Sequence, residues 1–156
     1  MSLALSPDAD SRPRKARPQA PSAASGLLLW QAANAWQRRA RAALQEVDLT
    51  YVQALLLIAV DQAAGEENLT QGALARSCGT DVTMTSQVLR TLERKALVTR
   101  RRGRDARSRV PMPTAEGRVV AQAAARSLAA AEDEFFGAVG ALDRMRRALQ
   151  KLGHHG

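Results

Sequence analysis

The chain has 156 residues and 46% of them are apolar, which suits one domain with a modest hydrophobic core and excludes a globally disordered protein. No apolar run approaches the roughly 18 residues of a membrane-spanning helix, and no signal peptide is recognisable, so we expect no membrane partner. The single cysteine, Cys78, has no partner for a disulfide within the chain. Together these features predict a cytoplasmic protein.

The formal net charge of +8 is concentrated in one short stretch. Residues 90–109 hold nine basic residues and two acidic ones, a surplus of seven, and residues 1–21 add four basic against two acidic ones. The rest of the chain is therefore close to neutral. A solvated charged face usually mixes both signs, whereas a local surplus is typical of a surface that binds a polyanion. Composition alone leaves open a basic loop that only keeps the chain soluble.

The first part of the chain predicts a tail and two helices. Residues 1–24 are rich in Pro, Ser, Ala and Arg without periodicity, which indicates a disordered basic tail. Residues 25–48 show an amphipathic stripe that includes Trp36 and predict a helix. Thr50 with Gln53 three residues later forms the capping-box pattern of a helix start. The nearly uniform apolar run that follows, 54–60, predicts a buried helix.

Residues 69–95 have the pattern of a helix-turn-helix. Thr70 is the expected N-cap of a short helix, residues 78–80 form a turn with glycine, and Asp81 is the expected N-cap of a longer helix to about Lys95. One face of this longer helix is expected to pack inward: Val82, Thr85, Val88, Leu89, Leu92 and Ala96. The opposite face carries groups that hydrogen-bond to base edges and phosphates: Thr83, Ser86, Gln87, Arg90 and Arg94.

A two-stranded hairpin is predicted directly after this helix. Residues 97–100 and 109–112 are the expected strands, with a basic turn at 103–108 between them. Pro111 and Pro113 cannot donate to a strand ladder, so we expect an edge strand in which both face outward. A hairpin after a recognition helix is a wing. Its basic side chains are candidate DNA contacts: Arg100, Arg101, Arg102, Arg104, Arg107 and Arg109.

Two helices are expected after the wing. Thr114 is the predicted N-cap of a long helix, and a last helix follows Gly137 with an apolar stripe of Leu142, Met145, Leu149 and Leu152. A small head cannot cover both stripes, so we assign them to subunit pairing. The predicted fold class is therefore all-α with a small β-wing. Its expected parts are a tail (1–24), an N-terminal dimerisation helix (25–48), a winged helix-turn-helix domain (49–113) and C-terminal dimerisation helices (114–156).

Five short segments resemble motifs of the MarR family of winged helix-turn-helix regulators, in order and at matching separations. They are Leu-Thr-Tyr-Val-Gln at 49–53, Leu-Thr-Gln followed by Leu-Ala at 69–75, Leu-Glu-Arg-Lys-Ala-Leu-Val at 92–98, Asp-Ala-Arg at 105–107 and Thr-Ala-Glu-Gly at 114–117. The match covers roughly residues 26–152. Two departures stand out: Ala96 occupies a usual glycine position, and Pro111 and Pro113 replace aliphatic wing residues.

The resemblance implies a homodimer that binds double-stranded DNA, with the recognition helix in the major groove. It implies that Arg107 reaches the minor groove from the wing tip and that Asp105 braces the wing arginines. Many relatives repress transcription and release DNA when a small phenolic or lipophilic compound occupies the cleft between reading head and dimer helices. A small-molecule effector is therefore expected.

Three other interpretations stay open. Cys78 is either a redox sensor, as some relatives have, or a small buried hydrophobe. The winged helix is either a DNA reader or a protein-interaction module, although an uncompensated basic wing favours DNA. An enzyme is the third, but the sequence offers no glycine-rich phosphate loop and no nucleophile–base constellation, so we expect no catalytic residues and no cofactor. His154 and His155 lack acidic or cysteine partners at ligand spacing, so we expect no metal site.

Overall fold

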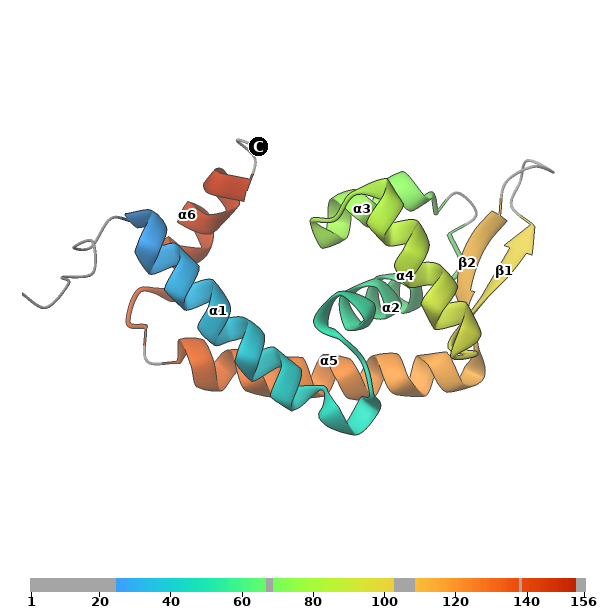
Figure 1. Cartoon of the computed structure of the whole chain (residues 1–156), viewed down its shortest axis with the longest axis horizontal. Coiled ribbons are helices and arrows are strands. Elements are labelled where there is room, and N and C mark those ends of the chain that lie inside the picture. The colour runs from blue at the N-terminus through green and yellow to red at the C-terminus, as the bar shows by residue number, and fades with distance from the viewer. Residues whose placement is uncertain (1–24, 67–68, 103–108, 138, 154–156) are drawn as a thin grey trace, which may run out of the picture.

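The computed structural model describes residues 25–66, 69–102, 109–137 and 139–153, and its fold is mostly helical with one two-stranded sheet (Figure 1). The elements are α1 (Ser25–Ala43), the 3₁₀ turn η1 (Gln45–Val47), α2 (Tyr51–Gln62), α3 (Gln71–Cys78), α4 (Val82–Arg94), β1 (Val98–Arg102), β2 (Arg109–Pro113), α5 (Ala115–Phe136) and α6 (Leu142–Gly153). The predictions for the N-terminal tail, the wing tip at 103–108 and the two terminal histidines lie outside the described residues.

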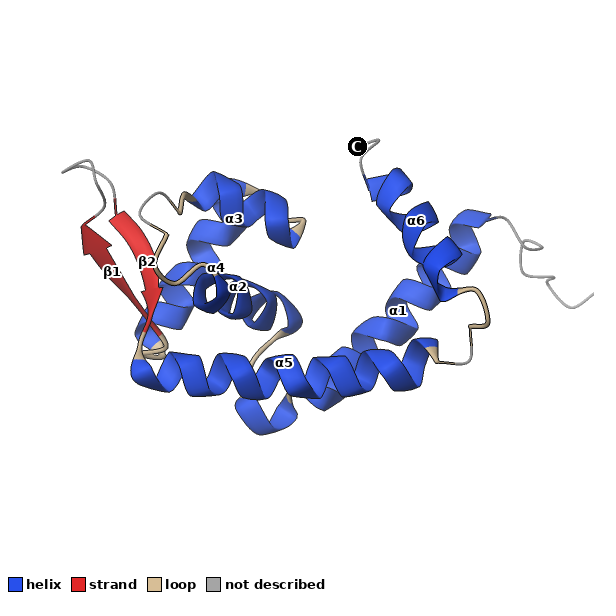
Figure 2. Ribbon diagram, turned by 180° about the vertical axis from the view of Figure 1, so that it is seen from behind, coloured by secondary structure: helices blue, strands red, loops and turns tan. Residues whose placement is uncertain are grey.

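Helix α5 runs along the length of the molecule and carries two groups of elements at its two ends (Figures 1 and 2). Helices α2, α3 and α4 and the sheet lie at its N-terminal end, while α1 and α6 lie toward its C-terminal end. In the core, the fully buried Leu56 and Leu57 of α2 and Leu89 and Leu92 of α4 join a cluster that includes Ala121 and Ala124 of α5. Among the described residues, no helix combines the length and apolar character that crossing a bilayer requires.

Four helix starts predicted from the sequence are confirmed by their caps. Thr50 and Gln53 form a reciprocal capping box, in which each side chain accepts the other residue's backbone N–H. The side chains of Thr70, Asp81 and Thr114 accept backbone N–H groups at the starts of α3, α4 and α5. These local hydrogen bonds satisfy donors that the first helical turn leaves unpaired, which is why they could be located from spacing alone.

Two expectations about which side chains face inward were wrong. Val82 and Ala96 were expected on the inward face of α4, but both are exposed because they lie at its two ends, beyond the core. Pro111 and Pro113 were expected to face outward, but both are buried. The backbone N–H of Thr114 donates to the carbonyl of Leu97. The β1–β2 register then places both prolines in non-hydrogen-bonded pairs of the antiparallel ladder. The backbone nitrogen of each proline therefore faces away from β1, where no ladder hydrogen bond is needed, while its ring packs inward.

The junction between α4 and β1 requires a left-handed residue. Ala96 has a φ of 58°, and the backbone N–H groups of Ala96 and Leu97 donate to the carbonyls of Glu93 and Leu92, which is the Schellman arrangement. Glycine adopts this conformation without the Cβ clash that alanine suffers. Ala96 therefore keeps the geometry of the usual glycine, but at a cost in stability.

Replacing Ala96 with Gly is expected to stabilise the fold by about 1 kcal/mol, because it removes the left-handed strain. The free energy of unfolding from chemical denaturation measures this change. Ala129→Gly is the matched control, since Ala129 is exposed within α5, where glycine costs about 1 kcal/mol instead. Destabilisation by both substitutions would contradict the assigned backbone strain.

Close backbone contact explains the glycine that follows the α5 cap. A Cβ built on Gly117 would lie 1.9 Å from the carbonyl oxygen of Leu97. The Thr114 hydroxyl donates to the carbonyl of Ala96 at 2.8 Å and accepts from the N–H of Gly117 at 2.9 Å. The start of α5 is thereby fixed against the end of α4, which orients the recognition helix relative to the long helix.

Candidate nucleic-acid interface

Helix α4 has one buried face and one exposed polar face. Thr85, Leu89 and Leu92 are buried and attach the helix to α2 and α3. The predicted reading residues lie on the other side: Thr83, Gln87, Arg90 and Arg94 are exposed, and Ser86 is half-buried. The helix therefore presents, as expected, a continuous row of hydrogen-bonding side chains to the solvent.

Hydrogen bonds along α4 hold its two arginines close to the helix surface. The guanidinium of Arg90 donates to the carbonyl and hydroxyl of Ser86, both at 3.4 Å, and that of Arg94 donates to the Thr91 hydroxyl at 3.0 Å. An open groove of about 690 Å³ runs beside them, lined by Gln87, Arg90, Thr91, Glu93 and Arg94. These are long, weak or solvent-facing contacts, so the guanidinium groups can exchange them for base edges or phosphates.

The arginines of the sheet differ in how freely they can meet DNA. Arg101 and Arg102 on β1 and Arg109 on β2 are exposed. Arg100 is half-buried and forms an ion pair with Glu93 of α4. This pair neutralises much of the charge of Arg100 and ties β1 to the recognition helix, a role that spacing alone did not suggest. Arg104, Asp105 and Arg107 lie outside the described residues.

An exposed polar helix followed directly by an antiparallel basic hairpin defines a winged helix-turn-helix DNA-binding protein. Its helix is narrow enough for the major groove, and the arginines of the hairpin supply positive charge for the phosphate backbone.

Comparison with known proteins agrees with this class. The family model described as "MarR family" matches residues 47–108. YdcH, an uncharacterised HTH-type transcriptional regulator of Bacillus subtilis (strain 168), is 35% identical over 86% of this chain and 93% of its own length. The Mycobacterium tuberculosis transcriptional regulator MosR, solved in complex with DNA, is 26% identical with a TM-score of 0.72, over 85% of this chain and 96% of its own.

A MarR family protein of M. tuberculosis, solved in complex with salicylic acid, is 28% identical with a TM-score of 0.62, over 85% of this chain and 98% of its own. The chain belongs to the MarR family and is a DNA-binding transcriptional regulator. Its relatives are transcriptional regulators and not enzymes.

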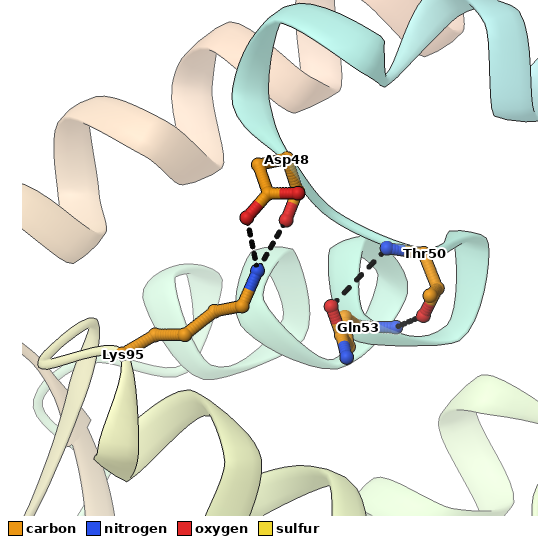
Figure 3. Close-up of polar contacts among 4 residues, drawn as sticks. All are labelled: Asp48, Thr50, Gln53 and Lys95. Atoms are coloured by element: carbon orange, nitrogen blue, oxygen red, sulfur yellow. Dashed lines mark hydrogen bonds and ion pairs between the residues drawn. The ribbon is translucent and has the colours of Figure 1, made fainter.

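A contact between α4 and the α1–α2 connection escaped sequence reasoning. The ammonium of Lys95, at the end of α4, donates to both the backbone carbonyl and the carboxylate of Asp48, as Figure 3 shows beside the Thr50–Gln53 capping box. The Lys95 ammonium, by hydrogen bonding and by its charge, lowers the pKa of the Asp48 carboxyl. Asp48 is fully solvated, so screening keeps the contribution of this pair to stability small. No sequence signal relates residues 47 positions apart.

A cavity of about 450 Å³ lies beside this contact, where the end of α1 and η1 meet α2. Arg41, Asp48, Tyr51, Gln53 and Lys95 contribute to its lining, so it combines two cations and one carboxylate with an aromatic ring. The Tyr51 ring in turn packs edge-on against Trp36, with ring centroids 6.0 Å apart. This cavity lies where the C-terminal end of α1 and the α1–α2 connection meet the start of α2 and the end of α4.

Three further side chains have ordinary structural surroundings. Trp36 packs against the core and contacts Phe135 and Phe136 of α5, whereas Trp30 is exposed on α1. Cys78 is half-buried and packs against the core at the end of α3. Among the described residues, nothing marks its thiol as a reactive group, so the redox-sensor interpretation gains no support.

Proposed function

We propose that this regulator is a homodimeric repressor that binds a pseudo-palindromic operator on double-stranded DNA in the cytoplasm. The observation that supports the proposal is the joint exposure of the α4 polar face and the β1 arginines Arg101 and Arg102. In this proposal the α4 residues read bases in the major groove. The wing arginines bind phosphates, Arg107 enters the minor groove, and Asp105 braces it.

Dimerisation is supported by helix α6, in which no residue is buried. An isolated helix of this length is marginal in water, so α6 needs a partner surface. Leu149 and Leu152 are exposed, and Leu142 and Met145 are only half-buried. Helix α1 adds exposed Leu28, Leu29 and Trp30. Apolar surface of this extent on two helices fits a second copy of the chain better than solvent.

The operator prediction follows from two-fold symmetry. A dimer of this kind places its two recognition helices about 34 Å apart, one helical turn of DNA. Selection from a random duplex library by the full chain should therefore return inverted repeats whose half-sites are centred about 10 base pairs apart. Selected sequences without symmetry would contradict the dimeric reading mode, and the absence of any enriched sequence would contradict sequence-specific binding. Footprinting on genomic DNA then locates the regulated genes.

We further propose that an aromatic acid or a similar lipophilic compound releases the protein from its operator. The salicylic acid complex of the mycobacterial relative supports this ligand class. The cavity lined by Arg41, Tyr51 and Lys95 supports the location, because a carboxylate can pair with the cations while its ring packs against Tyr51. A ligand there competes with Asp48 for Lys95 and so acts on the end of α4.

Salicylate is expected to raise the dissociation constant for the selected operator, and operator should weaken salicylate binding by the same factor. Fluorescence anisotropy measures the first effect and calorimetry the second. Arg41→Gln should reduce the response to salicylate while leaving operator affinity without ligand close to wild type. Unchanged operator affinity across a panel of aromatic acids would argue against this release mechanism.

A further inference from the structure

The first turn of α4 inverts the usual distribution of polar and apolar side chains. Thr85 points inward and is 0% exposed, donating its hydroxyl to the carbonyl of Asp81 at 2.8 Å. Val82 and Met84 point outward and are 54% and 43% exposed. A buried threonine beside two exposed large apolar residues is the reverse of what folding alone favours. Packing of the core therefore does not account for the two apolar side chains at the tip of the recognition helix.

Among the described residues, Val82 and Met84 lie apart from the other large apolar side chains that are exposed. The remaining large apolar residues that are exposed lie on α1, on α6, in the connection before α6 or, for Val119, on α5. Val82 and Met84 instead flank Thr83 at the tip of α4, each rotated by about 100° from it around the helix axis, so they lie at the two margins of the reading face. The apolar pair therefore belongs to the DNA-facing surface rather than to the surface assigned to subunit pairing.

The chemistry at this tip favours base edges over phosphates. The Asp81 carboxylate accepts the backbone N–H of Met84 at 2.7 Å, so that donor is committed within the helix. Its negative charge also disfavours a phosphate directly at the tip. In the major groove the single apolar group on a base edge is the C5-methyl of thymine. The N-terminal residues of a recognition helix are those that contact base edges.

We propose that Val82 and Met84 read thymine through its C5-methyl group, on the two sides of the base position that faces Thr83. This inference rests on the proposed operator binding and adds an apolar component to its specificity. Each methyl buried against one of these side chains should change operator affinity by about fourfold, the effect of removing one CH₂-sized group from water. The hydrogen bonds of Gln87 and Arg90 would then specify the neighbouring base pairs.

Parallel selections with DNA that contains or lacks the methyl group test this proposal. The same random duplex library is amplified with either thymidine or deoxyuridine triphosphate, and the full chain selects from each. With thymine, two T positions should be enriched in each half-site. With uracil, which keeps every hydrogen-bonding group, enrichment at those positions should fall while the rest of the consensus persists. At one such position, an operator with 5-methylcytosine should bind more tightly than the same operator with cytosine, because the two bases differ only in this methyl group.

Variants identify the protein side of the contact. Val82→Ser removes both methyl groups of the valine and Met84→Gln replaces the thioether with an amide of similar length, and circular dichroism checks that the fold is retained. Each should reduce the affinity ratio between thymine and uracil operators by about fourfold per half-site, whereas Val119→Ser, at the matched exposed valine on α5, should leave this ratio unchanged. Equal binding of wild type to both operators would overturn the methyl inference and leave operator recognition intact. Failure to enrich any sequence from the thymine library would overturn the proposed function itself.

Discussion

Replacing Gln87 or Arg90 with Ala should lower the ratio of operator affinity to random-DNA affinity. The free-energy difference between the two kinds of DNA should shrink by about 1–3 kcal/mol for each bidentate base contact that is lost. Both side chains are exposed on the face of α4 that enters the major groove in our proposal. Base contacts are made only with the matching sequence, so their removal should affect the operator far more than a scrambled duplex. Titrations of the selected operator and its scrambled form measure the ratio.

The β1 arginines should behave differently. The double substitution of Arg101 and Arg102 by Ala is expected to weaken operator and random DNA to a similar extent. It should also flatten the logarithmic dependence of affinity on salt by about 0.9 for each phosphate that the variant no longer neutralises. Arg100→Ala should have less effect on this slope, because Arg100 is already paired with Glu93.

Arg126→Ala, which removes an exposed arginine from α5, is the control for a general change of charge. The assignment of roles fails if the α4 substitutions leave the operator-to-random ratio unchanged and the β1 substitutions abolish it. In that case the hairpin, and not the helix, reads the sequence.

Changing Leu149 and Leu152 together to Asp should convert the dimer into a monomer and weaken operator binding by about 100-fold or more, because the two half-sites then bind independently. Both leucines are exposed within one protomer, so their replacement should not disturb its own core. The pair is a cleaner choice than one that includes Leu142, which is half-buried. Sedimentation velocity at micromolar concentration measures the oligomeric state.

Val119→Asp serves as the control, because it places the same charge on an exposed apolar position of α5, away from α6. It should remain dimeric. A wild-type protein that sediments as a monomer at micromolar concentration would contradict the proposed assembly, and so would a double variant that remains dimeric.

The helices, their starts and the class of protein could be predicted from the sequence because they depend on local chemistry. Caps such as Thr50 and Asp81 act within three residues of their partners. The 3.6-residue periodicity separates the exposed Gln87 and Arg90 from the buried Leu89. The basic surplus at 90–109 belongs to one continuous segment. Each of these signals is complete within a few turns of chain, so no knowledge of distant contacts was needed.

Contacts between distant segments were decided only by the tertiary structure. The pairing of Lys95 with Asp48 and the contact of Gly117 with the Leu97 carbonyl both depend on how α4, α5 and the α1–α2 connection meet. Periodicity placed Val82 inward because it assumes that the core extends beside the whole helix, whereas in the first turn of α4 Thr85 is buried and Val82 already lies beyond the core. Pro111 was placed outward because its missing N–H was equated with the direction of its ring. In a strand the N–H lies in the plane of the sheet and the side chain perpendicular to it, so a proline without a ladder partner can still be buried.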